Sequence, residues 1–435
     1  MIPVLLFDDG LTDLGPLSDL RASWEQRTGA LSAAERWLLA GRLAGVLCAQ
    51  GRQAAEAQRL ARTVAALAGQ HAATPPSQPQ GGHAAVPAVN PRPHEAVLVN
   101  ARFDVRAEDV DALHPGSSVR DPQGVLIAAR RSGAELASVV TAVAAGSPVP
   151  EHTALRAATP APPAHTTSWQ RPWHLLDAAA FDQRLARDFE LLTSCWQPSE
   201  HGTVPSWATH AGRGAVHVHA TAQVGANVVL DTTGGPIVLD RECTVRHQAV
   251  IMGPAYIGPR SWISEHSLVK ARSSIGPQCK VGGEVGSVIF QGCSNKVHDG
   301  HLGDALVGEW VNLGAGTVNS NLLNTYAEVV MRLRPSAPLE RTGRQFMGCV
   351  VGDHTKLAIG TRIMTGTSIG TGTMWAASTP ASGAVRAFTW ATDDGERQYQ
   401  ADKFVATARL VMARRHVTLD APEEAQLRAL LAAAP

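Results

Sequence analysis

The chain has 435 residues, of which 44% are hydrophobic and 17% charged. This composition excludes an intrinsically disordered protein and suffices for about three domains of roughly 150 residues each. Lys and Arg together number 38, as do Asp and Glu, and this neutral balance argues against a nucleic-acid or acidic-membrane partner.

No apolar run reaches the roughly 18 residues that span a bilayer, and the acidic start Met1–Asp9 predicts a strand rather than a signal peptide. The six cysteines form no CxxC pair, which argues against a disulfide framework or a zinc ribbon. We expect a soluble, cytoplasmic protein.

Residues 1–165 are expected to form an α/β domain. Leu38, Leu39, Leu43, Val46 and Leu47 follow a helical spacing, which predicts helices within residues 31–67. Strands are expected at residues 96–100 and 124–129. The Pro- and Gly-rich residues 72–94 predict a loop, and a second Pro-rich stretch, residues 159–165, predicts a domain boundary. Residues 166–200 are expected to link the domains, with one amphipathic helix over residues 175–192.

The strongest pattern in the sequence is a strict period of six. Eight consecutive hexads carry an aliphatic residue at the same place: Leu239, Val245, Ile251, Ile257, Ile263, Val269, Ile275 and Val281. Shorter runs flank them at Val218, Val224 and Leu230, at Val307 and Leu313, and at Val351, Leu357, Ile363, Ile369 and Trp375. Helices repeat at 3.6 residues and strands at 2, so a period of six indicates a triangular, left-handed parallel β-helix over residues 201–382.

The interruptions of this period predict where loops leave the coil. They fall at residues 286–306 and 319–350, and loops on a rigid scaffold tend to carry function. Residues 383–435 are expected to form a helical tail, with helices over about 399–415 and 422–431.

Residues 275–321 hold the most specific motif. Lys296-Val-His298 is followed by Leu302-Gly-Asp304, by Asn312-Leu-Gly-Ala-Gly-Thr317 and by Asn321. This stretch closely resembles the acetyltransferase half of the bifunctional sugar-1-phosphate nucleotidyltransferase/amino-sugar-1-phosphate N-acetyltransferases, above all the archaeal enzymes and the alternative bacterial UDP-N-acetylglucosamine pyrophosphorylase branch. Residues 16–37 (PLSDLRASWEQRTGALSAAERW) are similar to the opening signature of that family, PLTxxRPxxxLRxGxxTxxEKW.

The resemblance implies an acetyl-CoA-dependent N-acetyltransferase that acts on an amino-sugar 1-phosphate. It places the catalytic base at His298, since imidazole is the side chain that ionises near neutrality. It also implies that side chains contact the sugar substrate and that backbone groups contact acetyl-CoA. The substrate contacts would be Asn312, Asn321, Lys296 and Lys270, and acetyl-CoA would contact Ala358 and Ala376.

Two departures from the family matter. His301 stands where the bacterial enzymes have a sugar-binding tyrosine, and the lysine that follows the second asparagine is missing, for which Arg332, Arg334 or Arg344 is a candidate replacement.

The N-terminal part departs further, because it lacks the Gly-rich loop that cradles nucleotide phosphates in classical nucleotidyltransferases. The family signature there implies nucleotide contacts at Arg21, Arg27, Gly29 and Arg36, with an NTP and Mg²⁺ required if this domain is active.

Other interpretations stay open. The chain is interpreted alternatively as a nucleotidyltransferase whose β-helix serves assembly, or as a non-catalytic trimeric scaffold. By analogy with the fold we expect a homotrimer. A zinc site is a further hypothesis, but three ligands must converge, and the pair His298-x-x-His301 has no matching third histidine. The candidate zinc ligands are His247, His266, His298, His301 and His354.

Overall fold

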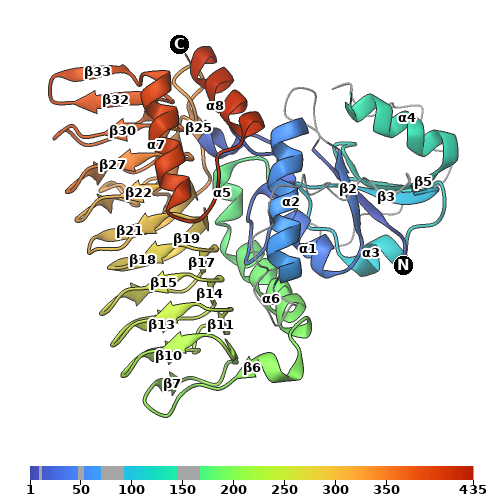
Figure 1. Cartoon of the computed structure of the whole chain (residues 1–435), viewed down its shortest axis with the longest axis horizontal. Helices are drawn as coiled ribbons and strands as arrows, with labels where there is room; N and C mark the ends of the chain where they lie inside the picture. Colours follow the sequence, from blue (N-terminus) through green and yellow to red (C-terminus); the bar gives the residue numbers. More distant parts are fainter. Residues whose placement is uncertain (9–11, 48–52, 70–92, 145–166, 435) are drawn as a thin grey trace. The chain divides into compact units, whose positions relative to one another are not determined.

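The computed structural model describes residues 1–8, 12–47, 53–69, 93–144 and 167–434 and divides into two compact units (Figure 1). The N-terminal unit comprises Met1–Thr12, Arg21–Gln26 and Ser32–Gln170. The β-helix unit comprises Asp13–Leu20, Arg27–Leu31 and Arg171–Pro435. Two short segments from the first 31 residues therefore belong to the β-helix unit. Residues 72–92 of the expected loop and the expected boundary at 159–165 lie outside the described residues.

The N-terminal unit contains a five-stranded sheet in the order β2-β1-β3-β5-β4. The central strand β1 pairs in parallel with β2 and β3, and β5 runs antiparallel to β3. The strands and helices of this unit are β1 (Val4–Phe7), η2 (Ser23–Glu25), α1 (Ala33–Leu39), β2 (Leu43–Leu47), α2 (Gln53–Gly69), β3 (Glu95–Asn100), α3 (Ala107–Asp111), β4 (Ser118–Arg120), β5 (Leu126–Ser132) and α4 (Gly133–Ala144). The strands expected at 96–100 and 124–129 are confirmed as β3 and β5.

The helix expected to include Leu43, Val46 and Leu47 is wrong, because these residues form strand β2. Helix α1 ends before Gly41, whose φ of +66° breaks the helical path. Pairing with β1 then overrides the local helical spacing.

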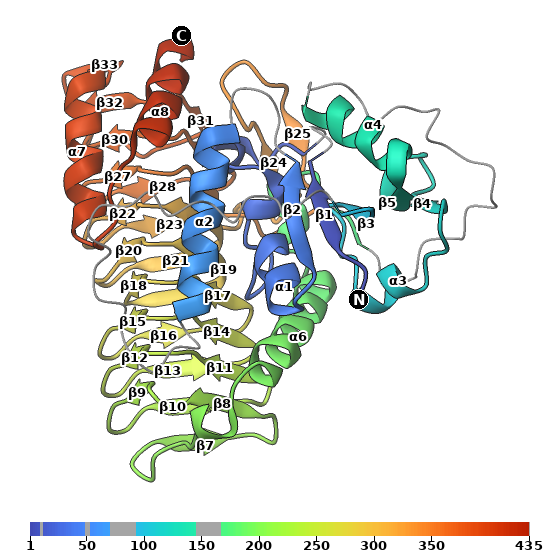
Figure 2. The same cartoon turned by 45° about the vertical axis from the view of Figure 1, so that its right-hand side comes forward.

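The β-helix unit begins with α5 (Pro172–Leu175) and α6 (Ala178–Ser194) and continues as a left-handed parallel coil (Figure 2). The expected linking helix is confirmed as α6. The 3-10 turns η1 (Gly15–Ser18) and η4 (Pro198–Glu200) also belong to this unit.

The coil has three faces. Face A holds β7 (Thr209–Ala211), β10 (Val229–Asp231), β13 (Val250–Met252), β16 (Leu268–Val269), β23 (Val318–Asn319) and β28 (Arg362–Ile363). Face B holds β8 (Val216–His219), β11 (Ile237–Leu239), β14 (Ala255–Ile257), β17 (Ser273–Ile275), β26 (Cys349–Val351), β29 (Thr367–Ile369) and β31 (Ala384–Val385), with β6 (His201–Gly202) at its start. The long strands β19 (Glu284–Gly292) and β21 (His301–Glu309) cross from face A to face B. Face C holds β9 (Gln223–Val224), β12 (Thr244–Val245), β15 (Trp262–Ile263), β18 (Lys280–Val281), β20 (Asn295–Lys296), β22 (Asn312–Leu313), β27 (Lys356–Leu357), β30 (Met374–Trp375), β32 (Thr389–Thr392) and β33 (Gly395–Gln398).

The hexad residues fill the axis of the coil. The eight aliphatic residues from Leu239 to Val281 are at most 1% exposed, so their burial explains the period of six. Corner residues take positive φ at the same interval, for example His266 (58°), Arg272 (58°) and Gln278 (55°). Gly282, which follows an axial residue, has no space for a side chain: a Cβ there would lie 1.8 Å from the Val297 carbonyl oxygen of the next turn.

One of the two expected loops is wrong and one is confirmed. Residues 286–306 stay within the coil as β19, β20 and β21. The strict period fails there because Val281 pairs with Lys296 after a shortened turn, and a lysine takes the axial place. Residues 322–346 do leave the coil and carry the antiparallel pair β24 (Val330–Met331) and β25 (Glu340–Arg341). We name residues 322–346 the excursion loop.

The tail contains α7 (Ala401–Ala413) and α8 (Ala421–Ala433), as expected. The sheets of the coil continue past residue 382 through β31 and β32. The two helices share an apolar cluster with Trp310, Phe388 and Tyr399. Among the described helices, none is long and apolar enough to cross a membrane.

Candidate functional site

Face A carries a chain of charged side chains across three neighbouring turns of the coil. Glu284 lies directly below His301 in the register of β19 and β21. Its Oε1 accepts a hydrogen bond from Lys270 Nζ at 2.5 Å and lies 3.2 Å from His301 Nδ1. The Lys270 ammonium and the His301 imidazole hold the pKa of Glu284 below its usual value. Glu284 is therefore an anion that orients two cationic or hydrogen-bonding groups.

A second carboxylate, Asp304, lies on β21, the strand that also carries His301. Asp304 Oδ2 accepts a hydrogen bond from Asn321 Nδ2 at 2.8 Å, and its Oδ1 lies 3.6 Å from an Nη of Arg344. Burial raises the pKa of Asp304, while Asn321 and Arg344 oppose that rise. Two carboxyl groups in one cluster thus have pKa values displaced in opposite directions, an arrangement common at sites of acid–base chemistry. We name Lys270, Glu284, His301, Asp304, Asn321 and Arg344 the face A cluster.

Glycines make room for this cluster. A Cβ at Gly303 would lie 2.6 Å from His301 Nε2 and 2.8 Å from Asn321 Nδ2. A Cβ at Gly286 would lie 2.9 Å from the Cβ of Lys270. The polar side chains therefore lie across the backbone of the coil, where any larger residue would displace them.

His298 lies at the corner between faces C and A, in the turn that precedes β21, and its side chain is exposed. Lys296 supports this corner from inside. Its side chain is 1% exposed, and Nζ donates to the carbonyl oxygens of Gly282 (3.0 Å), His298 (3.0 Å) and Asp299 (3.4 Å). Burial lowers the pKa of Lys296 to about 8. The ammonium expected to contact substrate is thus turned into the coil, away from solvent.

The same corner carries small residues on the turns above His298. Backbone hydrogen bonds connect Gly314 to Leu357 and Ala358 to Trp375, each across one turn. Ala358 and Ala376 each follow an axial residue, as Gly314 does. Both alanines expected to line acetyl-CoA therefore lie in one column with the turn of His298.

Asn312 lies elsewhere. It is exposed on face C, pairs in register with Asn295 and Lys356, and its Oδ1 accepts a long 3.4 Å hydrogen bond from Asn295. Asn321 and Lys270 belong to the face A cluster, so the structure does not bring Asn312 together with them within one coil.

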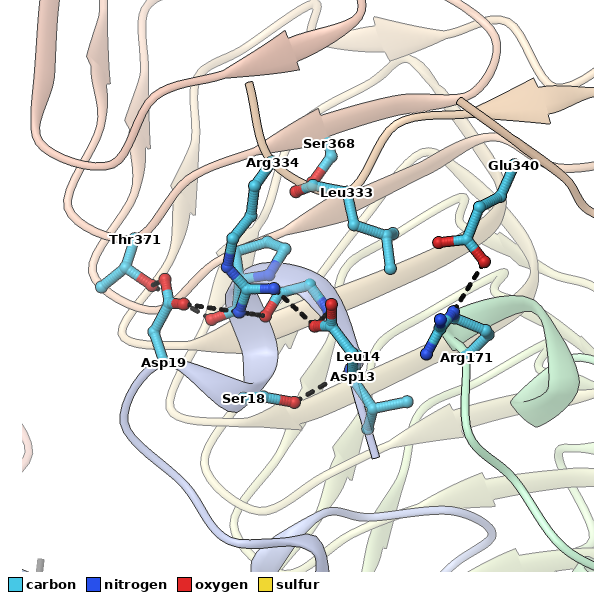
Figure 3. Close-up of polar contacts among 12 residues, drawn as sticks. Asp13, Leu14, Ser18, Asp19, Arg171, Leu333, Arg334, Glu340, Ser368 and Thr371 are labelled. Atoms are coloured by element: carbon cyan, nitrogen blue, oxygen red, sulfur yellow. Dashed lines mark hydrogen bonds and ion pairs between the residues drawn. The ribbon is translucent and has the colours of Figure 1, made fainter. Parts of the chain in front are cut away.

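The excursion loop is fixed at its far end by the Asp13–Leu20 segment, as Figure 3 shows. The Arg334 guanidinium donates to Asp13 Oδ1 at 2.5 Å, to the Gly15 carbonyl at 2.8 Å and to Asp19 Oδ1 at 3.0 Å. Thr371 Oγ1 donates to the other oxygen of Asp19 at 2.8 Å. Arg334 therefore joins the loop to the Asp13–Leu20 segment and, through Asp19, to Thr371 next to face B of the coil.

Two further contacts hold the loop. Arg171 Nε donates to Glu340 Oε2 at 2.8 Å, and Ser368 Oγ donates to the Leu333 carbonyl at 2.8 Å (Figure 3). The near end of the loop carries Arg344. Of the three candidate replacements for the missing lysine, Arg344 is the one that reaches the face A cluster. Arg334 is committed to the loop anchor instead, and exposed Arg332 donates to the Pro335 carbonyl.

The predicted nucleotide-binding residues divide between the two units. Arg27 and Gly29 lie in the β-helix unit: the Arg27 backbone N–H donates to Gln291 Oε1 at 2.7 Å, and the Gly29 carbonyl accepts from Ser274 Oγ at 2.6 Å. The Arg27 guanidinium donates to the carbonyls of Gln291 and Ala30. Arg21 and Arg36 lie in the N-terminal unit, each 9% exposed.

Sequence reasoning did not single out Glu284, and it named Asp304 only within the motif Leu302-Gly-Asp304, without a role. Their signal is weak in the sequence, because each meets its partners, 14 to 40 residues away along the chain, only after the turns of the coil have been stacked. In the described part of the chain, no group of three or more His, Cys, Asp or Glu side chains could hold a metal ion.

Known proteins resemble the chain over short stretches. A bifunctional sugar-1-phosphate nucleotidylyltransferase/acetyltransferase of Sulfurisphaera tokodaii is 30% identical over 109 residues, which cover 25% of this chain and 26% of that protein. The bifunctional protein GlmU of Clavibacter sepedonicus is 33% identical over 104 residues (23% and 21%), and that of Rippkaea orientalis is 36% identical over 61 residues (14% of each). The chain is similar to this bifunctional family. The matches span about a quarter or less of the length of these relatives, and no family model matches the sequence.

Solved structures give a likeness of low score. The superposition with the UDP-N-acetylglucosamine acyltransferase of Francisella novicida covers 50% of this chain and 74% of that chain, with a TM-score of 0.29 and 12% identity. AntD, an N-acyltransferase from Bacillus cereus, covers 47% and 91%, with a TM-score of 0.17 and 8% identity. Scores this low do not bear on function.

Proposed function

We propose that the chain is an acetyl-CoA-dependent N-acetyltransferase that acts on an amino-sugar 1-phosphate such as glucosamine 1-phosphate, in nucleotide-sugar biosynthesis. The face A cluster is the observation that carries this proposal. It offers two cations, Lys270 and Arg344, for a phosphate, and an amide, Asn321, for a sugar hydroxyl, next to the corner that carries His298. The similarity to bifunctional nucleotidylyltransferase/acetyltransferases supports the same chemistry.

In this proposal His298 acts as a general base toward the sugar amine. Asn312 and Asn321 bind the substrates and stabilise the oxyanion of the tetrahedral intermediate. The backbone at Ala358 and Ala376 lines the acetyl-CoA site, where small side chains permit close approach. Lys296 acts indirectly, because its ammonium holds the carbonyls of His298 and Asp299 and so fixes the catalytic corner.

We further propose that the chain forms a homotrimer. Asn312 lies on face C and Lys270 on face A of one coil, so a neighbouring copy would bring the two kinds of contact together. We place the protein in the cytoplasm, where acetyl-CoA is available.

The N-terminal unit is proposed to be a nucleotidyltransferase-like domain that would use an NTP. Mg²⁺ is usually bound by one or two carboxylates with substrate phosphates. Three acidic residues of this unit already have partners: Asp8 accepts from the Ser23 N–H, Glu25 pairs with Arg59, and Asp104 accepts from Thr167. Among the residues of this unit that the structure describes, no group of three or more His, Cys, Asp or Glu side chains could hold a metal ion, and no step is assigned to Mg²⁺.

The test is release of free CoA thiol from acetyl-CoA with glucosamine 1-phosphate or galactosamine 1-phosphate. We expect thiol release by the wild-type chain and its loss in His298→Ala. Ala358→Trp should raise the KM for acetyl-CoA and leave the KM for the sugar phosphate unchanged. Absence of thiol release with both sugars would refute the proposal, and pyrophosphate release from an NTP would then favour the nucleotidyltransferase alternative.

A further inference from the structure

The face A cluster contains an oriented imidazole, that of His301, to which the proposed acetyl transfer assigns no role. His301 Nδ1 lies 3.2 Å from Glu284 Oε1. When Nδ1–H donates to this carboxylate, Nε2 carries the lone pair and is able to accept a proton. A base held by a carboxylate in this way is a recurring arrangement in catalysis. Within the described residues, the His298 imidazole has no carboxylate at ion-pair distance.

The free edge of His301 points toward other polar groups. Its Nε2 and Asn321 Nδ2 both lie above Gly303, each within 3 Å of the place that a Cβ would occupy. Asn321 is fixed in turn by Asp304. An amine bound beside the Asn321 amide would therefore lie next to Nε2, with the glycine backbone as the floor of the site.

Amide formation from an ammonium requires two proton removals. The amine of an amino sugar ionises near the value of an α-amino group, about 8, so much of it is an ammonium at neutral pH. One proton must leave before nitrogen can attack the thioester, and a second must leave as the C–N bond forms. A single imidazole must release the first proton before it accepts the second.

We propose that His301, oriented by Glu284, removes the first proton from the substrate ammonium, and that His298 receives the second. The N–H bond breaks with its electron pair left on nitrogen, and the proton moves to His301 Nε2 and then to solvent. Nitrogen attacks the acetyl carbonyl, the C–S bond breaks, and the thiolate sulfur takes up a proton. The ammonium and acetyl-CoA thus yield the N-acetyl sugar, CoA thiol and one released proton. This assignment rests on the proposed acetyl transfer.

The charged groups around His301 come from four elements. Glu284 of β19 and Asp304 of β21 contribute negative charge to the cluster, and Lys270 after β16 and Arg344 of the excursion loop contribute positive charge. The imidazole is thus placed between groups of opposite charge.

The test is the pH dependence of kcat/KM for glucosamine 1-phosphate, from about pH 6 to about pH 9, across the range in which imidazole and amine ionise. Loss of a general base costs about 100-fold or more, so His301→Gln should show a defect of this size at the acid end. The defect should shrink to a few-fold above the ionisation of the amine, where substrate arrives already deprotonated. Glu284→Gln should give a smaller defect with the same dependence on pH, and His298→Ala should be defective at every pH.

The control is His416→Asn, an exposed histidine after α7 with a φ of +57° that Asn tolerates. It should match the wild type at every pH. A His301→Gln defect that is equal at all pH values would indicate a merely structural role and would overturn the assignment, as would full activity of this variant. An inactive wild-type chain would instead refute the proposed acetyl transfer, and the two failures are thereby distinguished.

Discussion

Replacing Lys296 with Met tests the buried charge at the corner that carries His298. Lys296 occupies an axial place of the coil, in register with Val281. Methionine has a similar length and suits an apolar axis. The substitution removes the ammonium and leaves the axis filled.

The magnitude follows from the pKa of Lys296. Burial lowers it from 10.5 to about 8. Between these pH values the unfolded chain binds more protons than the folded chain, so the free energy of unfolding rises with pH. A change of about 2.5 pKa units at 1.36 kcal/mol each gives about 3 kcal/mol. Below pH 8 the ammonium is charged in both states, and the full penalty of its burial remains.

The assay is urea unfolding of the wild type and Lys296→Met at several pH values between 8 and 10.5. We expect the wild type to gain about 3 kcal/mol relative to the variant across this range. Lys356, whose pKa burial lowers to about 7, is present in both proteins and cancels in the comparison. The control is Lys280→Met, an exposed lysine next to Val281 on β18, which should keep the slope of the wild type. Parallel curves for the wild type and Lys296→Met would refute this account of the corner.

Two further predictions concern the scaffold. Gly282→Ala should destabilise the coil by about 1–3 kcal/mol in chemical denaturation, because its Cβ would meet the Val297 carbonyl. Gly292→Ala, whose Cβ would make ordinary contacts at 3.4 Å, should be nearly neutral. Equal effects of the two substitutions would contradict the close-approach argument. Arg334→Gln should speed hydrogen exchange in the excursion loop, because Asp13 and Asp19 lose their shared cation. Arg332→Gln, in the same loop, should leave exchange unchanged, and unchanged exchange in Arg334→Gln would show that these ion pairs do not hold the loop.

The β-helix was predictable because a single physical demand repeats along it. Each face must bury one aliphatic residue in the axis, so the period of six appears wherever the turns are regular. The prediction failed at residues 286–306 because Lys296 fills the axial place and satisfies its ammonium with backbone carbonyls. A polar residue that is buried in this way has no signature in a hydrophobic pattern.

The site was predictable only in part. The resemblance to known enzymes pointed to Lys270 and Asn321, which both belong to the face A cluster. Glu284 was missed, and Asp304 was named only as part of a motif without a role, because their partners are defined by stacking of turns rather than by local spacing. The strand at Leu43–Leu47 was missed for a related reason, since pairing with β1 decides its conformation.

The most direct test of the account is identification of the product. The purified protein would be incubated with acetyl-CoA and glucosamine 1-phosphate, and the sugar would be analysed by mass spectrometry and by NMR of the new amide. We predict an N-acetylated sugar 1-phosphate in amounts equal to the CoA thiol released. Thiol release without an acetylated sugar, or an unchanged sugar with intact acetyl-CoA, would contradict the assignment of the β-helix as an amino-sugar-phosphate N-acetyltransferase.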